Sequence, residues 1–95
     1  MFDEGKKHLL DKNYKDAIKL FTLSLKYYPG NKDSKYYRAI CFLDNENTVK
    51  CISDLNELIE IDSGYNQTVY VILSIAYRRE NDLNSALRAV RDWYY

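Results

Sequence analysis

Residues 5–29 read GKKHLLDKNYKDAIKLFTLSLKYYP, and this stretch decides the fold. Apolar residues recur at three- and four-residue steps on both sides of a polar break at 11–13, a spacing typical of helices that bury one side. Asn13 can cap the second helix, and Pro29 cannot continue it. The stretch therefore predicts two helices joined by a short turn.

The same order of small and large residues returns twice further along the chain. Small residues recur at two places and a large apolar residue recurs at a third. The three sets are Gly5, Ala39 and Ser74; Ala17, Cys51 and Ala86; and Phe21, Leu55 and Val90. The first offset is thirty-four residues and the second is thirty-five, and one extra residue in the linker at 62–67 accounts for the difference. We therefore expect three similar helix pairs.

Polar breaks divide the rest of the chain into four further helices. Asp33 or Ser34 can begin the third helix, and the segment 44–47 ends it. Another turn at 62–64 is followed by helices over 69–77 and 83–93. The chain of 95 residues is long enough for one small domain with one modest core.

The recurrence resembles the tetratricopeptide repeat (TPR) family, with repeats at about 1–31, 32–65 and 66–95. The first repeat carries the family pattern at Gly5, Tyr14, Ala17, Phe21 and Pro29, and the third carries it at Tyr70, Leu73, Tyr77, Leu83 and Ala86. The second repeat departs from the pattern, with Cys51 in the alanine place and Ser63 in the proline place. The resemblance implies an all-α, right-handed superhelical solenoid of three helix-turn-helix repeats in a single domain.

The resemblance also implies a protein-interaction module, with a scaffold or adaptor role, that binds a peptide in a concave groove. The groove-facing side chains would be Phe2, Lys6, Leu9, Leu10, Tyr36, Ile40, Leu43, Asp44, Val71, Ile75, Arg78 and Arg79. Such a surface is apolar with a basic end, and it suits an extended or helical peptide with aliphatic anchors and an acidic group. Some of these residues, Leu9 and Ile40 especially, also fit a purely structural role in the core.

One branch of the family holds the carboxyl-terminal carboxylate of heat-shock chaperones with a clamp of lysines, asparagines and an arginine. The matching places here hold Phe2, Lys6, Tyr37, Thr68 and Ile72. None of them matches the clamp, and the apolar ones among them cannot replace charged donors. The resemblance therefore disfavours a chaperone-tail partner.

Two alternative roles keep the same fold. The chain from Tyr37 to Arg91 is also similar to the mitochondrial fission adaptor, in the polar break after Leu43 and in the run from Ala86 to Arg91. That family carries a tail anchor, for which this sequence shows no counterpart. The second alternative is a structural spacer in a large assembly.

The end of the last helix carries the aromatic residues Trp93, Tyr94 and Tyr95 with no polar helix after them. Repeat arrays need a solvating end. We therefore expect either a longer array, which we favour, or self-association through these aromatic residues. The basic cluster formed by Arg78, Arg79, Arg88 and Arg91 is interspersed with acidic residues and fits a solvated face.

Composition excludes several classes of function. The 14 basic and 14 acidic side chains cancel, which disfavours nucleic acid as a partner. Apolar runs are too short for direct membrane insertion, so we expect a cytoplasmic protein, with a peripheral place at an organelle surface as the alternative. One histidine and two separate cysteines provide no catalytic set, metal site or cofactor site, so we expect no enzyme.

Overall fold

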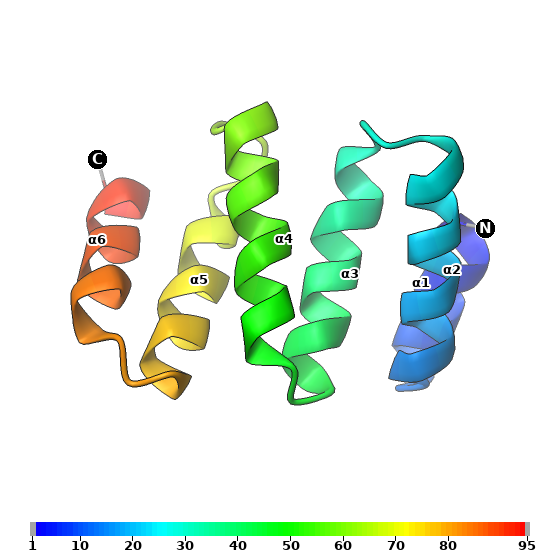
Figure 1. The fold of residues 1–95 in the computed structure, drawn as a ribbon, viewed down its shortest axis with the longest axis horizontal. Coiled ribbons are helices and arrows are strands. Elements are labelled where there is room, and N and C mark those ends of the chain that lie inside the picture. The colour runs from blue at the N-terminus through cyan, green and yellow to red at the C-terminus, as the bar shows by residue number, and fades with distance from the viewer. Residues whose placement is uncertain (1, 95) are drawn as a thin grey trace.

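The computed structural model describes residues 2–94, of which Tyr94 by its backbone alone. Within these residues every regular element is an α-helix, which confirms the all-α prediction. The helices are α1 (Phe2–Leu10), α2 (Tyr14–Tyr27), α3 (Lys32–Asp44), α4 (Thr48–Ile61), α5 (Thr68–Arg79) and α6 (Leu83–Tyr94). They lie side by side in an elongated array of 35 × 25 × 18 Å, with the two ends of the chain at opposite ends (Figure 1).

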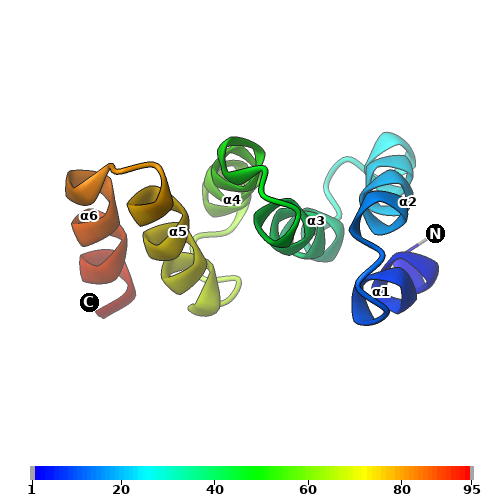
Figure 2. The same ribbon diagram turned by 90° about the horizontal axis from the view of Figure 1, so that it is seen from below.

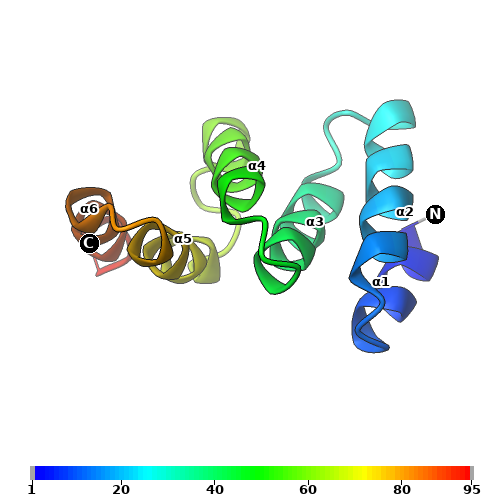
Figure 3. The ribbon, with the colours of Figure 1, turned by 60° about the horizontal axis from the view of Figure 1, so that its bottom comes forward.

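Consecutive helices pair into three antiparallel hairpins, α1–α2, α3–α4 and α5–α6. The first helices of the hairpins form one row and the second helices form the other (Figure 2). Each hairpin also packs on the next, α2 against α3 and α4 against α5. Figure 3 shows the resulting stepwise turn of the hairpins along the array. The predicted solenoid of three hairpins is therefore confirmed.

The small residues of the recurrence lie where paired helices cross. All six, which are Gly5, Ala39, Ser74, Ala17, Cys51 and Ala86, are buried. A small side chain lets two helix backbones approach closely. The large members Phe21 and Leu55 are fully buried and fill the space toward the next hairpin. The spacing of small and large residues thus sets both the pairing and the stacking of the hairpins.

The core consists of two clusters of buried residues. The smaller cluster contains Ala17, Phe21 and Cys41 and joins the first hairpin to α3. The larger cluster runs from α3 to α6 around Leu55, Leu58 and other apolar side chains. Because each cluster draws on more than one hairpin, the hairpins stabilise one another by stacking.

The start of the third helix and the capping of the second differ from the prediction. The third helix begins at Lys32, before Asp33 and Ser34, because the side chain of Asn31 caps it by accepting a hydrogen bond from the Ser34 backbone N–H at 3.1 Å. Asn13 precedes α2 as predicted, but its side chain makes no capping bond. Its amide nitrogen donates instead to Asp16 at 2.7 Å.

A buried ion pair fixes the middle hairpin. The Arg38 guanidinium on α3 donates two hydrogen bonds to the Asp54 carboxylate on α4, at 2.7 and 2.6 Å, and a third to Thr22 of α2 at 3.3 Å. Both partners are largely shielded from water. Their fork-like geometry is the strong form of a charge-assisted pair, so it orients α3 against both neighbouring helices.

Candidate functional site

The residues predicted to face a groove all lie on α1, α3 and α5, the row of first helices in Figure 2. They differ in how much surface they offer. Phe2, Lys6, Leu9, Ile40, Val71 and Ile75 are half-buried; Leu10, Asp44, Arg78 and Arg79 are exposed; and Tyr36 and Leu43 are buried. The half-buried members leave apolar surface open along this row, whereas Tyr36 and Leu43 mainly support it from the core.

One end of the row is a cluster of aromatic rings around Lys6. The ring of Phe2 lies 5.7 Å from that of Tyr37, centroid to centroid. The Lys6 ammonium lies 5.1 Å from the Tyr37 centroid and 5.7 Å from the Phe2 centroid. Two ring faces attract a cation at this range. Among residues 2–94 no carboxylate lies within ion-pair distance of Lys6, so its charge is available to a ligand.

The aromatic cluster continues to the loop before α5. The Tyr36 ring lies 5.3 Å from that of Tyr37 and 5.6 Å from that of Tyr65. The Tyr65 hydroxyl donates a hydrogen bond to the Asp33 carboxylate. Burial, and then this carboxylate, raise the pKa of Tyr65, so the hydroxyl stays protonated as a donor. These contacts carry the aromatic cluster from α1 across α3 to the linker before α5.

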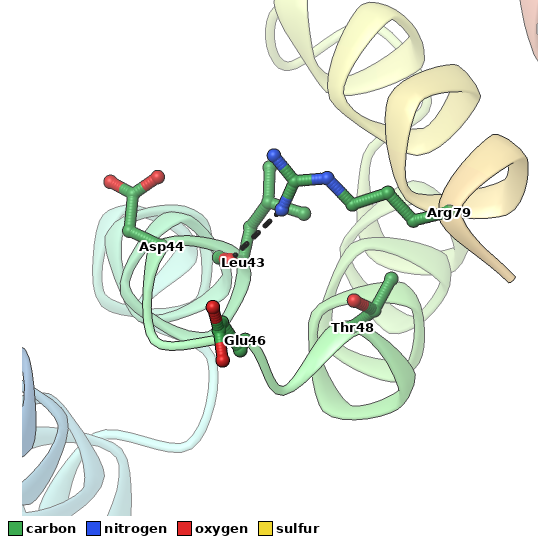
Figure 4. Close-up of a pocket in the computed structure, with 5 residues that line it drawn as sticks. All are labelled: Leu43, Asp44, Glu46, Thr48 and Arg79. Atoms are coloured by element: carbon green, nitrogen blue, oxygen red, sulfur yellow. Dashed lines mark hydrogen bonds between the residues drawn. The ribbon is translucent and has the colours of Figure 1, made fainter.

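The other end of the row holds a recess of about 360 Å³. Its lining residues are Leu43, Asp44, Glu46, Thr48 and Arg79 (Figure 4). Arg79 reaches across from α5 and donates a hydrogen bond to the Leu43 carbonyl at 3.2 Å. The Asp44 carboxylate points away from the guanidinium (Figure 4). Several guanidinium donors therefore remain for an acceptor on a ligand.

The aliphatic residues Ile40 and Ile75 lie on the helices between these two ends. Both are half-buried and pack against the larger core cluster. Their inner atoms belong to the core and their outer atoms to the surface, so they pack on the core and also leave apolar surface open on this row. The row thus offers aliphatic surface between an ammonium and a guanidinium.

The structure separates Arg78 from the recess of Arg79. Arg78 lines a different recess, between α5 and α6, together with Leu83 and Leu87. Glu46, Thr48 and Tyr65 belong to the two ends of the row but were not predicted from the sequence. Glu46 and Thr48 lie in or after the turn that follows α3, and Tyr65 lies in the longer linker. Only its nearness to Tyr36 and Tyr37 in the fold makes Tyr65 part of the cluster.

The remaining reactive groups lie in the core or make structural contacts. Burial raises the pKa of the Cys41 and Cys51 thiols to about 12. The His8 ring nitrogen Nδ1 lies 3.3 Å from the side-chain amide nitrogen of Asn13. Residues 2–94 contain no group of three or more potential metal ligands. None of the helices in this range has the length and apolar character that crossing a membrane requires.

Comparison with known proteins places this architecture among TPR domains. No protein-family model matches the chain. The TPR repeat-containing protein YsoA of Bacillus subtilis (strain 168) is 26% identical over 93 residues, which cover 95% of this chain and 28% of that protein. The chain thus spans under a third of the length of this curated relative.

Solved structures superpose closely on all three hairpins. The second TPR of Spaghetti (RPAP3), bound to the HSP90 peptide SRMEEVD, matches with a TM-score of 0.91 and 19% identity over 98% of this chain and 85% of that one. The Sgt2 TPR domain from Aspergillus fumigatus matches with a TM-score of 0.89 and 24% identity, over 97% of this chain and 60% of that one. MamA from Desulfovibrio magneticus RS-1 matches at 0.91 with 17% identity, over 98% and 52%. The fold is therefore that of a TPR domain.

Proposed function

We propose that this chain is a non-catalytic protein-interaction module, a scaffold or adaptor that binds a peptide segment of a partner along the row of first helices. The observation that carries the proposal is the arrangement of this row. It has an unpaired ammonium at one end, a guanidinium at the other and half-buried aliphatic side chains between them. Such a surface matches a peptide with aliphatic anchors and acidic groups.

The peptide-bound relative supports the site but not the same ligand. The second TPR of Spaghetti has the same fold and holds an HSP90 peptide. In this chain the places of the chaperone clamp hold Phe2, Lys6, Tyr37, Thr68 and Ile72. Phe2, Lys6 and Tyr37 form the aromatic cluster described above, and Ile72 is buried. We therefore expect a peptide other than a chaperone tail.

A selected peptide tests the groove directly. Peptides would be selected on the protein from a displayed random library, and the affinity of one synthetic winner would be measured by fluorescence anisotropy. We expect Ile75→Glu to weaken it at least about tenfold, because a carboxylate in the aliphatic surface is desolvated without a partner. Leu10→Glu, at a more exposed place in the same row, should act in the same direction without disturbing the core.

Val49→Glu is the matched control for both variants. Val49 lies on α4 in the other row and is 65% exposed, so this change should leave affinity unaltered. Helical circular dichroism verifies that each variant is folded. If all three variants bound the peptide with equal affinity, the proposed binding site in the groove would be contradicted. The spacer alternative would then be favoured, and it predicts that truncation at Trp93 impairs assembly more than these substitutions do. The relatives described above add no support to the fission-adaptor alternative.

We further propose that the carboxyl end of the array makes a self-association contact. The support is the exposed Trp93 in the last turn of α6. The side chain of Tyr94 and the whole of Tyr95, which belong to the same sequence prediction, lie outside the described residues.

A further inference from the structure

The helix α6 carries an apolar stripe that none of the other described side chains covers. Leu83, Leu87 and Val90 lie one or two turns apart on one side of the helix and are 64%, 68% and 43% exposed. With Ser74, Arg78 and Ala86 they line a recess of about 300 Å³ between α5 and α6. A contiguous apolar surface of this kind marks an interaction site.

The same repeat positions are buried or half-buried in the first two hairpins. Val90 corresponds to Phe21 and Leu55, and both of these are fully buried. Leu83 corresponds to the buried Thr48 and the half-buried Tyr14. Leu87 corresponds to Ile18 and Ile52, which are both half-buried. Those positions are buried or half-buried where α3 packs on α2 and α5 packs on α4. The stripe on α6 therefore has the form of a face made to receive another helix.

The opposite end of the array is charged and does not match this stripe. Arg38 and Cys41 of α3 pack toward α2, and their equivalents on α1 are Glu4 and Lys7, both exposed. Stacking the α1 end of one copy on the α6 end of another would place Glu4 beside Arg91, the counterpart of Thr22. It would, however, bury the Lys7 ammonium against Ala86 and Val90, the counterparts of Ala17 and Phe21. Burying an unpaired charge is strongly unfavourable. The structure thus disfavours a head-to-tail chain of copies.

We propose that two copies of this chain pair through the stripe of Leu83, Leu87 and Val90, with their α6 helices antiparallel about a twofold axis. This inference rests on the self-association proposed above and gives it a geometry. A twofold interface needs a patch that complements itself, as an apolar stripe does. Antiparallel packing also opposes the two helix dipoles.

The ends of the stripe support the antiparallel arrangement. Arg78 lies at the end where α6 begins, beside Leu83, and the exposed Trp93 lies in the last turn. Antiparallel pairing brings Trp93 of each copy toward Arg78 of the other, and a guanidinium is attracted to an indole face. Parallel pairing would instead bring the two Arg78 guanidinium groups together.

Sedimentation equilibrium tests whether the copies associate through this face. We expect the chain of 95 residues to show a reversible monomer–dimer equilibrium. The dissociation constant of the dimer should be at least about tenfold higher for Leu87→Glu. Val49→Glu places the same charge at a similarly exposed site and should leave the equilibrium unchanged. A strict monomer at millimolar concentration would overturn both the self-association and its geometry.

Cross-linking tests the geometry separately. Leu87 lies near the middle of the stripe, so in the twofold pair the two copies of this residue face each other. A short bis-maleimide should cross-link Leu87→Cys into a dimer but leave Val49→Cys a monomer, since the native thiols are buried. The geometry would be overturned if the dimer persisted in Leu87→Glu, or if Leu87→Cys could not be cross-linked. Either result would mean that the copies associate through another surface. If a further helix of a longer chain occupied the stripe, that longer chain would be a monomer and its Leu87→Cys thiol would not react with the maleimide. This result would also overturn the proposed pairing.

Discussion

Gly5 makes room for an aromatic ring where α1 crosses α2. A Cβ atom at Gly5 would lie 2.7 Å from Cε1 of Phe21, well inside van der Waals contact. The Phe21 ring is fully buried and packs against Phe2 and Tyr37, with centroid separations of 5.8 and 6.1 Å. The ring therefore has no free direction in which to move.

We expect Gly5→Ala to destabilise the fold although alanine is the better helix former. The gain in helix propensity is about 1 kcal/mol, whereas overpacking a filled core costs about 1–3 kcal/mol. Because the contact at 2.7 Å forces a buried ring to shift, we expect the upper part of that cost, about 2–3 kcal/mol. The net loss in the free energy of unfolding should then be roughly 1–2 kcal/mol, measured by urea denaturation. Gly30→Ala is the control, because a Cβ there meets no atom within 4 Å. Equal stability of Gly5→Ala and the native chain would contradict this account.

The requirement for a small residue at Gly5 could be predicted from the sequence, but its cause could not. The recurrence of Gly5, Ala39 and Ser74 indicates a close crossing in each hairpin. Which ring fills the crossing depends on how α2 lies across α1, and helical periodicity does not contain that angle. For the same reason the cation–π contacts of Lys6 follow only from the structure.

At the scale of elements, the turns inside the three hairpins share one backbone geometry. Lys12, Glu46 and Asn81 have φ values of 60°, 62° and 60°, the left-handed region. The following residue in each turn donates its backbone N–H to the carbonyl five positions back, for example Asn47 to Phe42 at 2.7 Å. This is the Schellman ending of a helix, in which glycine is the usual residue.

Glu46→Gly should therefore stabilise the middle hairpin. Glycine adopts the left-handed conformation without the steric cost that a glutamate bears there, and the Glu46 side chain is exposed. We expect the free energy of unfolding to rise by about 0.5–1 kcal/mol. Asn81→Gly should give a smaller gain, because asparagine tolerates this conformation. A loss of stability in Glu46→Gly, seen in thermal or urea unfolding, would show that its side chain has a structural role.

The sequence predicts that each helix exists, but it does not always predict where a helix begins and ends. The polar segments at 11–13 and 44–47 predict breaks, and the breaks are there. The start of α3 moved to Lys32, because the capping bond depends on where Asn31 points after the turn at Pro29. The left-handed conformation of Lys12 and Glu46 could not be predicted, since lysine and glutamate carry no signal for it.

At the scale of the whole molecule, Cys41 and Cys51 report on the stacking of the hairpins. They belong to the two different core clusters, and burial raises both pKa values to about 12. The thiolate is the reactive form, and at about pH 8 it amounts to roughly one thiol in ten thousand. Reaction therefore requires the array to open.

We expect both thiols to react with Ellman's reagent at about pH 8 more than about 100-fold slower in the native protein than in concentrated urea. Because a raised pKa depletes the thiolate, labelling should accelerate as the pH rises toward 12. Rapid labelling of Cys41 alone would show that the first hairpin detaches while the larger cluster stays closed.

The candidate groove was only partly accessible to sequence reasoning. The repeat spacing indicates which residues share the row of first helices, and it led to Lys6, Ile75 and Arg79. It does not indicate how the linker at 62–67 runs, and that path brings Tyr65 to Tyr36. Nor does it indicate that Arg78 turns toward α6, which depends on the side-chain direction at the end of α5.

The contrast between a charged first face and an apolar last face limits how such a gene could grow. A tandem duplication of the coding segment would set the Lys7 ammonium of the second unit against Ala86 and Val90 of the first. Such a product would fold as two separate domains joined by a linker instead of one continuous superhelix. Lengthening the superhelix would require a small apolar residue in place of Lys7, as at Cys41 and Ala76 in the later hairpins.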